Sequence, residues 1–173
     1  MPASMGTAIH NSVEDLCNLD LTGRDEAEAG WLTTTAKTVL DGHWKSEKEI
    51  FMETPRRPRW KNNLISKAND GLVGALHILL EKAQINQTEL SEVTVGSWRQ
   101  VQGIVLSNEA TLVSDCGRLM GRLDLLISNL KDGVSVGWIV ADLKTGKPPK
   151  EDLNEKVSRQ LRFYRDLVKH NNP

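Results

Sequence analysis

The sequence predicts an α/β (α+β) domain in which helices flank a central mixed, largely antiparallel sheet. Apolar residues recur at helical spacing through the first half of the chain and again near its end. Short runs rich in valine, isoleucine and leucine, separated by turn residues, fill the segment between them. Helices, then a meander of strands, then a helix that packs back onto the strands are typical of this class. The 173 residues suffice for one compact core, so we expect a single domain over residues 1–173.

Three helices are expected in the first half. Apolar residues at intervals of three and four predict an amphipathic helix over residues 7–18. A second helix is expected over residues 24–40, with acidic residues in its first turn, where the helix dipole favours them. A third is expected over residues 64–83. Residues 42–59 are polar and contain prolines, so we expect them to be irregular.

The second half alternates strands and turns before it returns to helical periodicity. The final helix is expected over residues 151–169, with Tyr164 on its apolar stripe. The expected strand segments are Val93 and Val95, then residues 101–106, 110–114, 118–128 and 134–144.

Composition excludes several classes of protein. No run approaches the ~20 apolar residues that cross a bilayer, and residues 1–6 lack the features of a secretory signal, so we expect a cytoplasmic protein with no membrane association. Cys17 and Cys116 are the only cysteines, which excludes a CxxC zinc knuckle and a four-cysteine iron–sulfur cluster held by this chain alone.

Charge is informative only locally. The formal net charge of −1 neither supports nor excludes a nucleic-acid partner. Two basic groups fit either a solvated surface or a polyanion-binding face. They are the segment from Arg56 to Lys61 and the set Arg159, Arg162, Arg165 and Lys169, which recurs at helical spacing.

Two carboxylates are expected to meet across a hairpin. A tight turn centred on residues 131–133 would place Asp124 almost opposite Asp142. Facing side chains of an antiparallel pair have Cβ atoms about 5 Å apart. Two like charges this close repel, and a divalent cation between them makes the arrangement favourable.

The second strand of this hairpin carries a further charge. Val136, Trp138, Val140, Asp142 and Lys144 share one face, because side chains alternate with a period of two. An apolar face that ends in a carboxylate and an ammonium fits a catalytic site. It fits equally well a structural ion pair between residues 142 and 144 at the strand end.

Four motifs in this order resemble one family. Gly121-Arg122-Leu123-Asp124 and Asp142-Leu143-Lys144-Thr145-Gly146-Lys147 resemble the core of the PD-(D/E)XK nuclease superfamily, and its RecB-like branch in particular. That branch includes RecB and AddB nuclease domains and the CRISPR-adaptation nucleases. Residues 6–10 resemble its first-helix motif, and Gln160 with Tyr164 resembles its QxxxY motif. The resemblance spans residues 6–168 and implies a restriction-endonuclease-like core.

The resemblance implies a metal site that holds Mg²⁺ or Mn²⁺. Asp124 and Asp142 would bind the metal, and the carbonyl of Leu143 would add a backbone ligand. His10 would supply a nitrogen, which suits Mn²⁺ better than Mg²⁺. A lone helical histidine is otherwise a capping or packing residue, and we expect His77 to be a packing residue of this kind.

The resemblance also implies catalytic roles. Lys144 would orient or deprotonate the attacking water and stabilise the developing charge. Gln160 and Tyr164, which lie one helical turn apart, would position the scissile strand and Lys144. Glu109 matches an acidic position that the branch often carries before the GxxD strand. It fits a solvated turn residue equally well.

The implied activity is a metal-dependent deoxyribonuclease, expected to act as an exonuclease in DNA repair, recombination or defence. Its expected partners are single-stranded DNA or duplex ends and a helicase or larger repair complex. Two alternatives remain open, a catalytically inactive nucleic-acid-binding subunit and a nuclease that acts on RNA. The helix that usually precedes the first motif is missing, so the chain fits a domain cut from a longer protein or a reduced stand-alone member.

Overall fold

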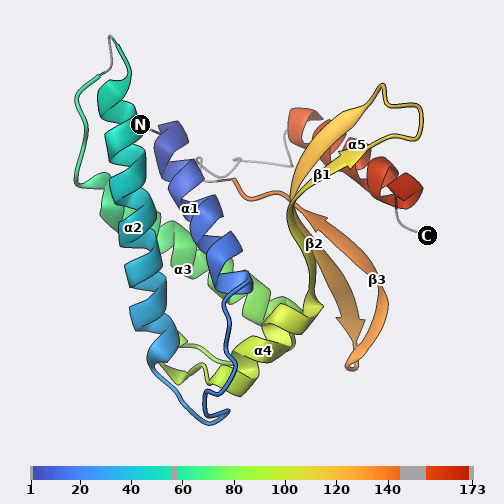
Figure 1. The fold of residues 1–173 in the computed structure, drawn as a ribbon. Helices are drawn as coiled ribbons and strands as arrows, with labels where there is room; N and C mark the ends of the chain where they lie inside the picture. The colour runs from blue at the N-terminus through green and yellow to red at the C-terminus, as the bar shows by residue number, and fades with distance from the viewer. Residues whose placement is uncertain (1, 56–57, 145–154, 172–173) are drawn as a thin grey trace. The chain divides into compact units, whose positions relative to one another are not determined.

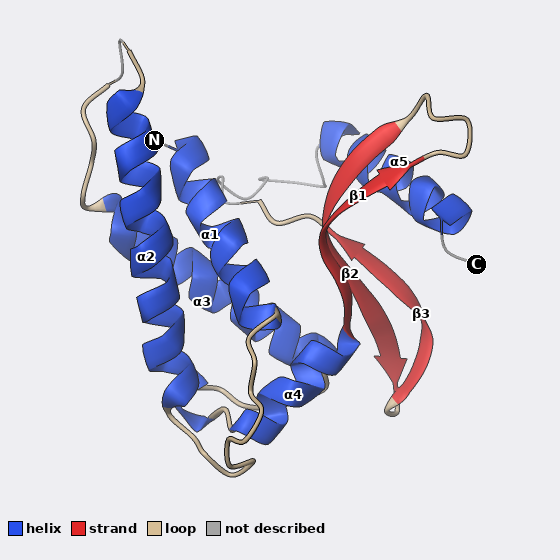
Figure 2. Ribbon diagram, in the orientation of Figure 1, coloured by secondary structure: helices blue, strands red, loops and turns tan. Residues whose placement is uncertain are grey.

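The computed structural model describes residues 2–55, 58–144 and 155–171, and it confirms the α+β class (Figures 1 and 2). The chain forms two compact units, Met1–Ile104 and Val105–Pro173. In the described residues the first unit is helical. The second contains a three-stranded sheet and one long helix.

The first unit is built from four α-helices and one 3₁₀ turn. They are α1 (Pro2–Cys17), α2 (Trp31–Glu53), α3 (Leu64–Lys82), η1 (Leu90–Glu92) and α4 (Val95–Ile104). The first helix packs against both α2 and α3. Apolar side chains at helical spacing form the core, and the largest fully buried one is Trp98. Its indole Nε1–H donates a hydrogen bond of 2.9 Å to the carbonyl of Leu16, which joins α4 to the end of α1.

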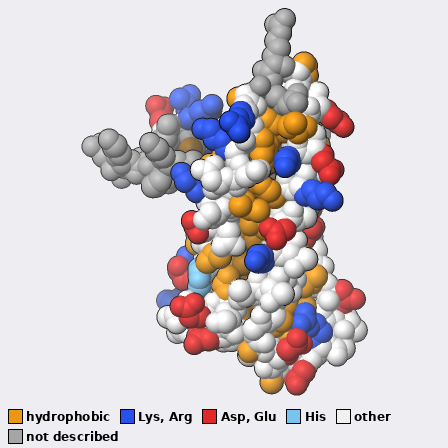
Figure 3. Space-filling view, turned by 90° about the vertical axis from the view of Figure 1, so that its left-hand side faces the viewer, with side chains coloured by type: hydrophobic (Ala, Val, Ile, Leu, Met, Phe, Trp, Pro, Cys, Tyr) orange, Lys and Arg blue, Asp and Glu red, His pale blue; other side chains and the backbone are white. Residues whose placement is uncertain are grey.

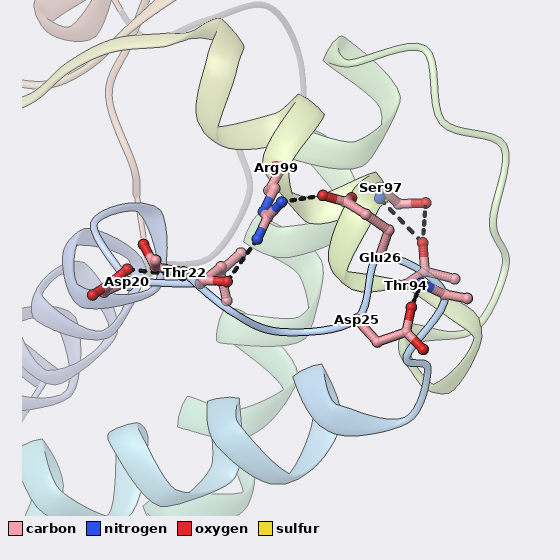
Figure 4. A network of polar contacts seen from close by, with 9 residues as sticks. Asp20, Thr22, Asp25, Glu26, Thr94, Ser97 and Arg99 are labelled. Carbon is pink, nitrogen blue, oxygen red and sulfur yellow. Dashed lines mark hydrogen bonds and ion pairs between the residues drawn. The ribbon is translucent and has the colours of Figure 1, made fainter.

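The loop between α1 and α2 is anchored on the first turns of α4 (Figure 4). The guanidinium of Arg99 donates to the carbonyl of Leu21 at 2.7 Å and forms an ion pair with Glu26. The amide of Gly96 donates to the carbonyl of Glu26 at 3.0 Å. A Cβ on Gly96 would lie 3.3 Å from the carbonyl oxygen of Glu26, so the absence of a side chain eases this approach. The Thr94 hydroxyl caps the helix by accepting from the Ser97 amide at 3.1 Å.

The second unit is an antiparallel sheet covered by one helix. Its strands are β1 (Val105–Val113), β2 (Met120–Lys131) and β3 (Val134–Ala141), in the order β1-β2-β3. Helix α5 (Glu155–Asn171) packs on the sheet. Tyr164 and Val168 of α5 form a buried cluster with Leu123 and Leu126 of β2.

The hairpin of β2 and β3 has the expected tight turn and one irregularity. Asp132 and Gly133 have φ values of 51° and 77°, which a two-residue hairpin turn of type I′ requires. The register shifts by one residue between Asn129 and Leu130. The last paired residues are Leu125 and Ala141, so the same register continued by one position places Asp124 opposite Asp142.

Several predicted boundaries in the first unit are wrong. The first helix begins at Pro2 rather than at residue 7. The second begins at Trp31, after Gly30 in the left-handed conformation at φ 78°, so Asp25, Glu26 and Glu28 lie in the preceding loop. It continues to Glu53 through residues predicted to be irregular, because Trp44 is buried one turn after Leu40.

The predicted strand segments around Val93, Val95 and residues 101–106 are also wrong, because a helix occupies most of this region. Val95, Trp98, Val101 and Ile104 are buried at intervals of three residues, which is one face of α4. The valines favour a strand by propensity. Burial of one helical face outweighs that preference, and β1 begins only at Val105.

Two features of the sheet also differ from the expectation. The three described strands are all antiparallel, whereas the expected sheet was mixed but largely antiparallel. The third strand ends at Ala141 rather than at residue 144, and Val134, Val136 and Trp138 near its start are exposed. The register shift interrupts the alternation of side chains, so the predicted single apolar face is not continuous.

The surface is mixed in character. Figure 3 shows one face, on which basic and acidic side chains are interspersed around a band of hydrophobic ones. Among the described helices, none is long and apolar enough to cross a bilayer.

Candidate active site

Asp124 reaches across the hairpin to the backbone beyond the end of β3. Its Oδ2 accepts a hydrogen bond of 2.6 Å from the amide of Leu143. That nitrogen is bonded through one carbonyl carbon to the Cα of Asp142, about 2.5 Å away. The Asp124 carboxylate therefore lies within roughly 5 Å of the Asp142 Cα, so the two acidic residues are neighbours as expected.

Asp142 is held by contacts to both of its oxygens. Its side chain is 3% exposed, and Oδ1 accepts a hydrogen bond of 3.2 Å from Gln160 Nε2. The Nζ of Lys144 lies 2.6 Å from Oδ2, while the lysine side chain itself is 53% exposed. This contact is short, but it is not aligned as a hydrogen bond. Within the described part of the chain, Oδ2 is thus buried with a charge beside it and no aligned donor.

Gln160 connects Asp142 to the core of the unit. The same Nε2 that donates to Asp142 also donates to Tyr164 Oη at 3.1 Å. An amide nitrogen carries two protons, so both contacts are made at once. The ring of Tyr164 is packed in the cluster with Leu123 and Val168, which fixes the phenol that Gln160 contacts.

The structure brings most of the predicted site residues together. Asp124, the Leu143 amide, Asp142, Lys144, Gln160 and Tyr164 all lie in the second unit and are joined by the contacts above. His10 lies half-buried on α1 of the first unit, and its role as a ligand stays a prediction. Glu109 lies on β1, with its side chain outside those described, and residues 145–147 lie outside the described residues.

The carboxylates suit a hard divalent cation. Across residues 2–55, 58–144 and 155–171, no three His, Cys, Asp or Glu side chains cluster as a ready-made metal site. Mg²⁺, however, keeps several waters and needs only one or two protein carboxylates. The buried Oδ2 of Asp142, which lacks an aligned donor, is an oxygen that such an ion would satisfy. Asp124, Asp142 and a backbone carbonyl are therefore a donor set that fits a Mg²⁺ ion.

One residue of the site had no predicted structural role. Gly121 was noted only as part of a motif, yet Tyr164 and Phe163 lie against its backbone. No spacing or periodicity in the sequence could have identified this contact, because it joins a strand to a helix about forty positions later.

The comparison with known families identifies one match. A family model described as the PD-(D/E)XK nuclease superfamily matches residues 1–173. No curated protein and no solved structure matches the chain.

Proposed function

The chain belongs to the PD-(D/E)XK nuclease superfamily, and from this premise we propose that it hydrolyses DNA phosphodiester bonds with Mg²⁺ or Mn²⁺. We propose further that it is an exonuclease acting on single-stranded DNA or duplex ends, in repair, recombination or defence, with a helicase or larger complex as partner. The observation that carries the proposal is the meeting of Asp124 and Asp142 at the end of the β2–β3 hairpin.

The carboxylates of Asp124 and Asp142 and the carbonyl of Leu143 would hold the metal. A bound divalent ion supplies a Lewis acid and lowers the pKa of water, which produces a nucleophile near neutral pH. Asp142 is nine-tenths or more shielded from solvent, so its charge is little screened and its attraction for a cation is strong.

Lys144 would act on the substrate. Its ammonium is anchored near Asp142 while half of its side chain faces solvent, so the group can contact both the carboxylate and an incoming phosphate. A cation here stabilises the negative charge that builds on the phosphate oxygens, and it can orient the attacking water. Gln160 holds Asp142 in one rotamer through Oδ1, and Tyr164 holds Gln160.

The test is a cleavage assay on end-labelled substrates. Linear single-stranded DNA, linear duplex, circular DNA and RNA are incubated with the protein in Mg²⁺, in Mn²⁺ and in EDTA. We expect metal-dependent release of short products from the linear DNAs, none in EDTA, and loss of activity in Asp142→Ala. Asp115→Ala, an exposed carboxylate in the β1–β2 turn, is the matched control and should cleave as the wild type does.

The outcomes separate the alternatives. Cleavage of circular DNA would replace exonuclease with endonuclease action. Cleavage of RNA alone would overturn the DNA assignment. Binding of nucleic acid without cleavage under any metal would leave a catalytically inactive binding subunit and refute the proposed reaction.

A further inference from the structure

Gly121 is where α5 comes against β2. A Cβ at this position would lie 2.6 Å from Tyr164 Cε1 and 3.1 Å from Phe163 Cε1. Carbon atoms in favourable contact are about 3.5–4.0 Å apart, so any side chain at residue 121 would push against these two rings. The missing side chain thus sets how closely the helix approaches the strand.

The ring that lies on Gly121 is also the ring that fixes Gln160. Tyr164 is buried at 9% exposure in the cluster with Leu123 and Val168, so it has little room to move aside. Its Oη accepts from Gln160 Nε2 at 3.1 Å, and the same nitrogen donates to Asp142 Oδ1 at 3.2 Å. Gln160 and Tyr164 lie on the same helix, so a displacement of the ring would shift α5 and change the distance from Gln160 to the carboxylate.

We propose that Gly121 is a positioning residue for the reaction: the absence of a side chain there holds α5 at the distance at which Gln160 reaches Asp142. Gly121 precedes Asp124 by three positions on the same strand. The two ends of this motif therefore act on the site from two sides, Asp124 directly and Gly121 through α5. The inference rests on the proposed function, because the step it affects is metal-dependent cleavage.

The first test is Gly121→Ala in the full chain. A misplacement of about 1 Å at a catalytic constellation can cost on the order of 100-fold in rate. We expect kcat to fall roughly 10- to 100-fold with KM for DNA within about twofold, at a temperature where circular dichroism shows the variant to be folded. Gly103→Ala on α4 is the control, because a Cβ there would have no atom within 4 Å among the described residues.

Two variants of Tyr164 distinguish an effect of Gly121→Ala on the position of α5 from a general loss of packing. Tyr164→Phe and Tyr164→Leu both remove the hydroxyl, but only the first keeps the ring carbon that a Cβ at residue 121 would meet. Adding Gly121→Ala should lower kcat strongly in the Tyr164→Phe background and much less in the Tyr164→Leu background. An equal loss in both would overturn the inference, and this comparison remains decisive if the single variant is unstable.

A spectroscopic readout does not depend on activity. Tyr164 is the only tyrosine in the chain, so labelling with 3-fluorotyrosine gives a single ¹⁹F resonance. We expect Gly121→Ala and Gln160→Ala each to shift this resonance, and Gly103→Ala to leave it in place. An unshifted resonance in Gly121→Ala, or a normal kcat with only a lower melting temperature, would refute the positioning role. A wild type without metal-dependent cleavage would refute the proposed function instead, and the ¹⁹F comparison would still decide whether Gly121 sets this contact.

Discussion

Replacing Asp142 with Asn should abolish stabilisation by metal without weakening the metal-free fold. The carboxylate is 3% exposed and its Oδ2 lacks an aligned donor among the described residues, so its desolvation is only partly compensated. Asn has nearly the same shape and can still accept from Gln160 through Oδ1, while its NH2 group then faces the Lys144 ammonium, which has to turn away into solvent. The Lys144 side chain is 53% exposed, so its ion pair with residue 142 contributes little stability, and little is lost when residue 142 becomes neutral. We expect the free energy of unfolding in EDTA to be unchanged or raised by roughly 1 kcal/mol.

The effect of metal on the wild type follows from linkage. A ligand that binds only the folded state at 100 times its Kd stabilises that state by about 2.7 kcal/mol. For a chain of this length each kcal/mol raises the melting temperature by about 2–4 °C. Wild-type protein should therefore melt roughly 5–10 °C higher in saturating Mg²⁺ or Mn²⁺ than in EDTA. Asp142→Asn should show almost none of this rise.

The assay is thermal unfolding followed by circular dichroism across a metal titration. Asp132→Asn is the matched control, because residue 132 is a turn position with φ 51° that asparagine also accepts. The control should keep the full metal-dependent rise in melting temperature. A full rise in Asp142→Asn would refute the assignment of residue 142 as a metal ligand, and so would an equal loss in both variants.

Three further outcomes are expected. Arg162→Gln, on the exposed face of α5, should reduce the slope of log affinity for DNA against log salt by about 1 and leave kcat unchanged, and an unaltered slope would exclude a phosphate contact. Burial raises the pKa of the Cys17 thiol to about 12, whereas a hydrogen bond with Ser114 lowers the pKa of Cys116. The thiolate fraction of Cys116 is therefore raised at neutral pH, and a thiol reagent should modify one group in the native protein and a second only after unfolding; two in the native state would contradict the burial of Cys17. Trp98→Phe should lower the free energy of unfolding by about 1–3 kcal/mol in a denaturant titration, because the carbonyl of Leu16 loses its donor, and an unchanged midpoint would count against that bond.

The second unit was the more predictable part of the fold. The turn at Asp132-Gly133 is encoded locally, since both residues tolerate positive φ, and it fixes the residue pairs nearest the turn. Apolar periodicity likewise placed Tyr164 on the inner face of α5, where it is buried. Local chemistry was sufficient in both cases.

The first unit was less predictable, because tertiary packing decides its boundaries. Asp25, Glu26 and Glu28 resemble the acidic first turn of a helix, yet the carbonyls of Glu26 and Glu28 accept hydrogen bonds from the amides at the start of α4. Those amides are about seventy positions away in the sequence, so no local window contains the interaction. The valines of α4 misled the prediction for a similar reason, since burial of one helical face against distant helices outweighed their preference for strands.

The two carboxylates face each other because of a β-bulge that the sequence does not predict. Near the turn, Lys131 pairs with Val134, and this register continued without interruption would place Ala141 opposite Asp124. The shift between Asn129 and Leu130 leaves Val136 as an extra residue on β3 and moves every later pair by one. A shift of one residue exchanges the two faces of a strand, so it decides which side chain of β3 faces Asp124. The motifs identify the two acidic residues, and the bulge places them opposite each other.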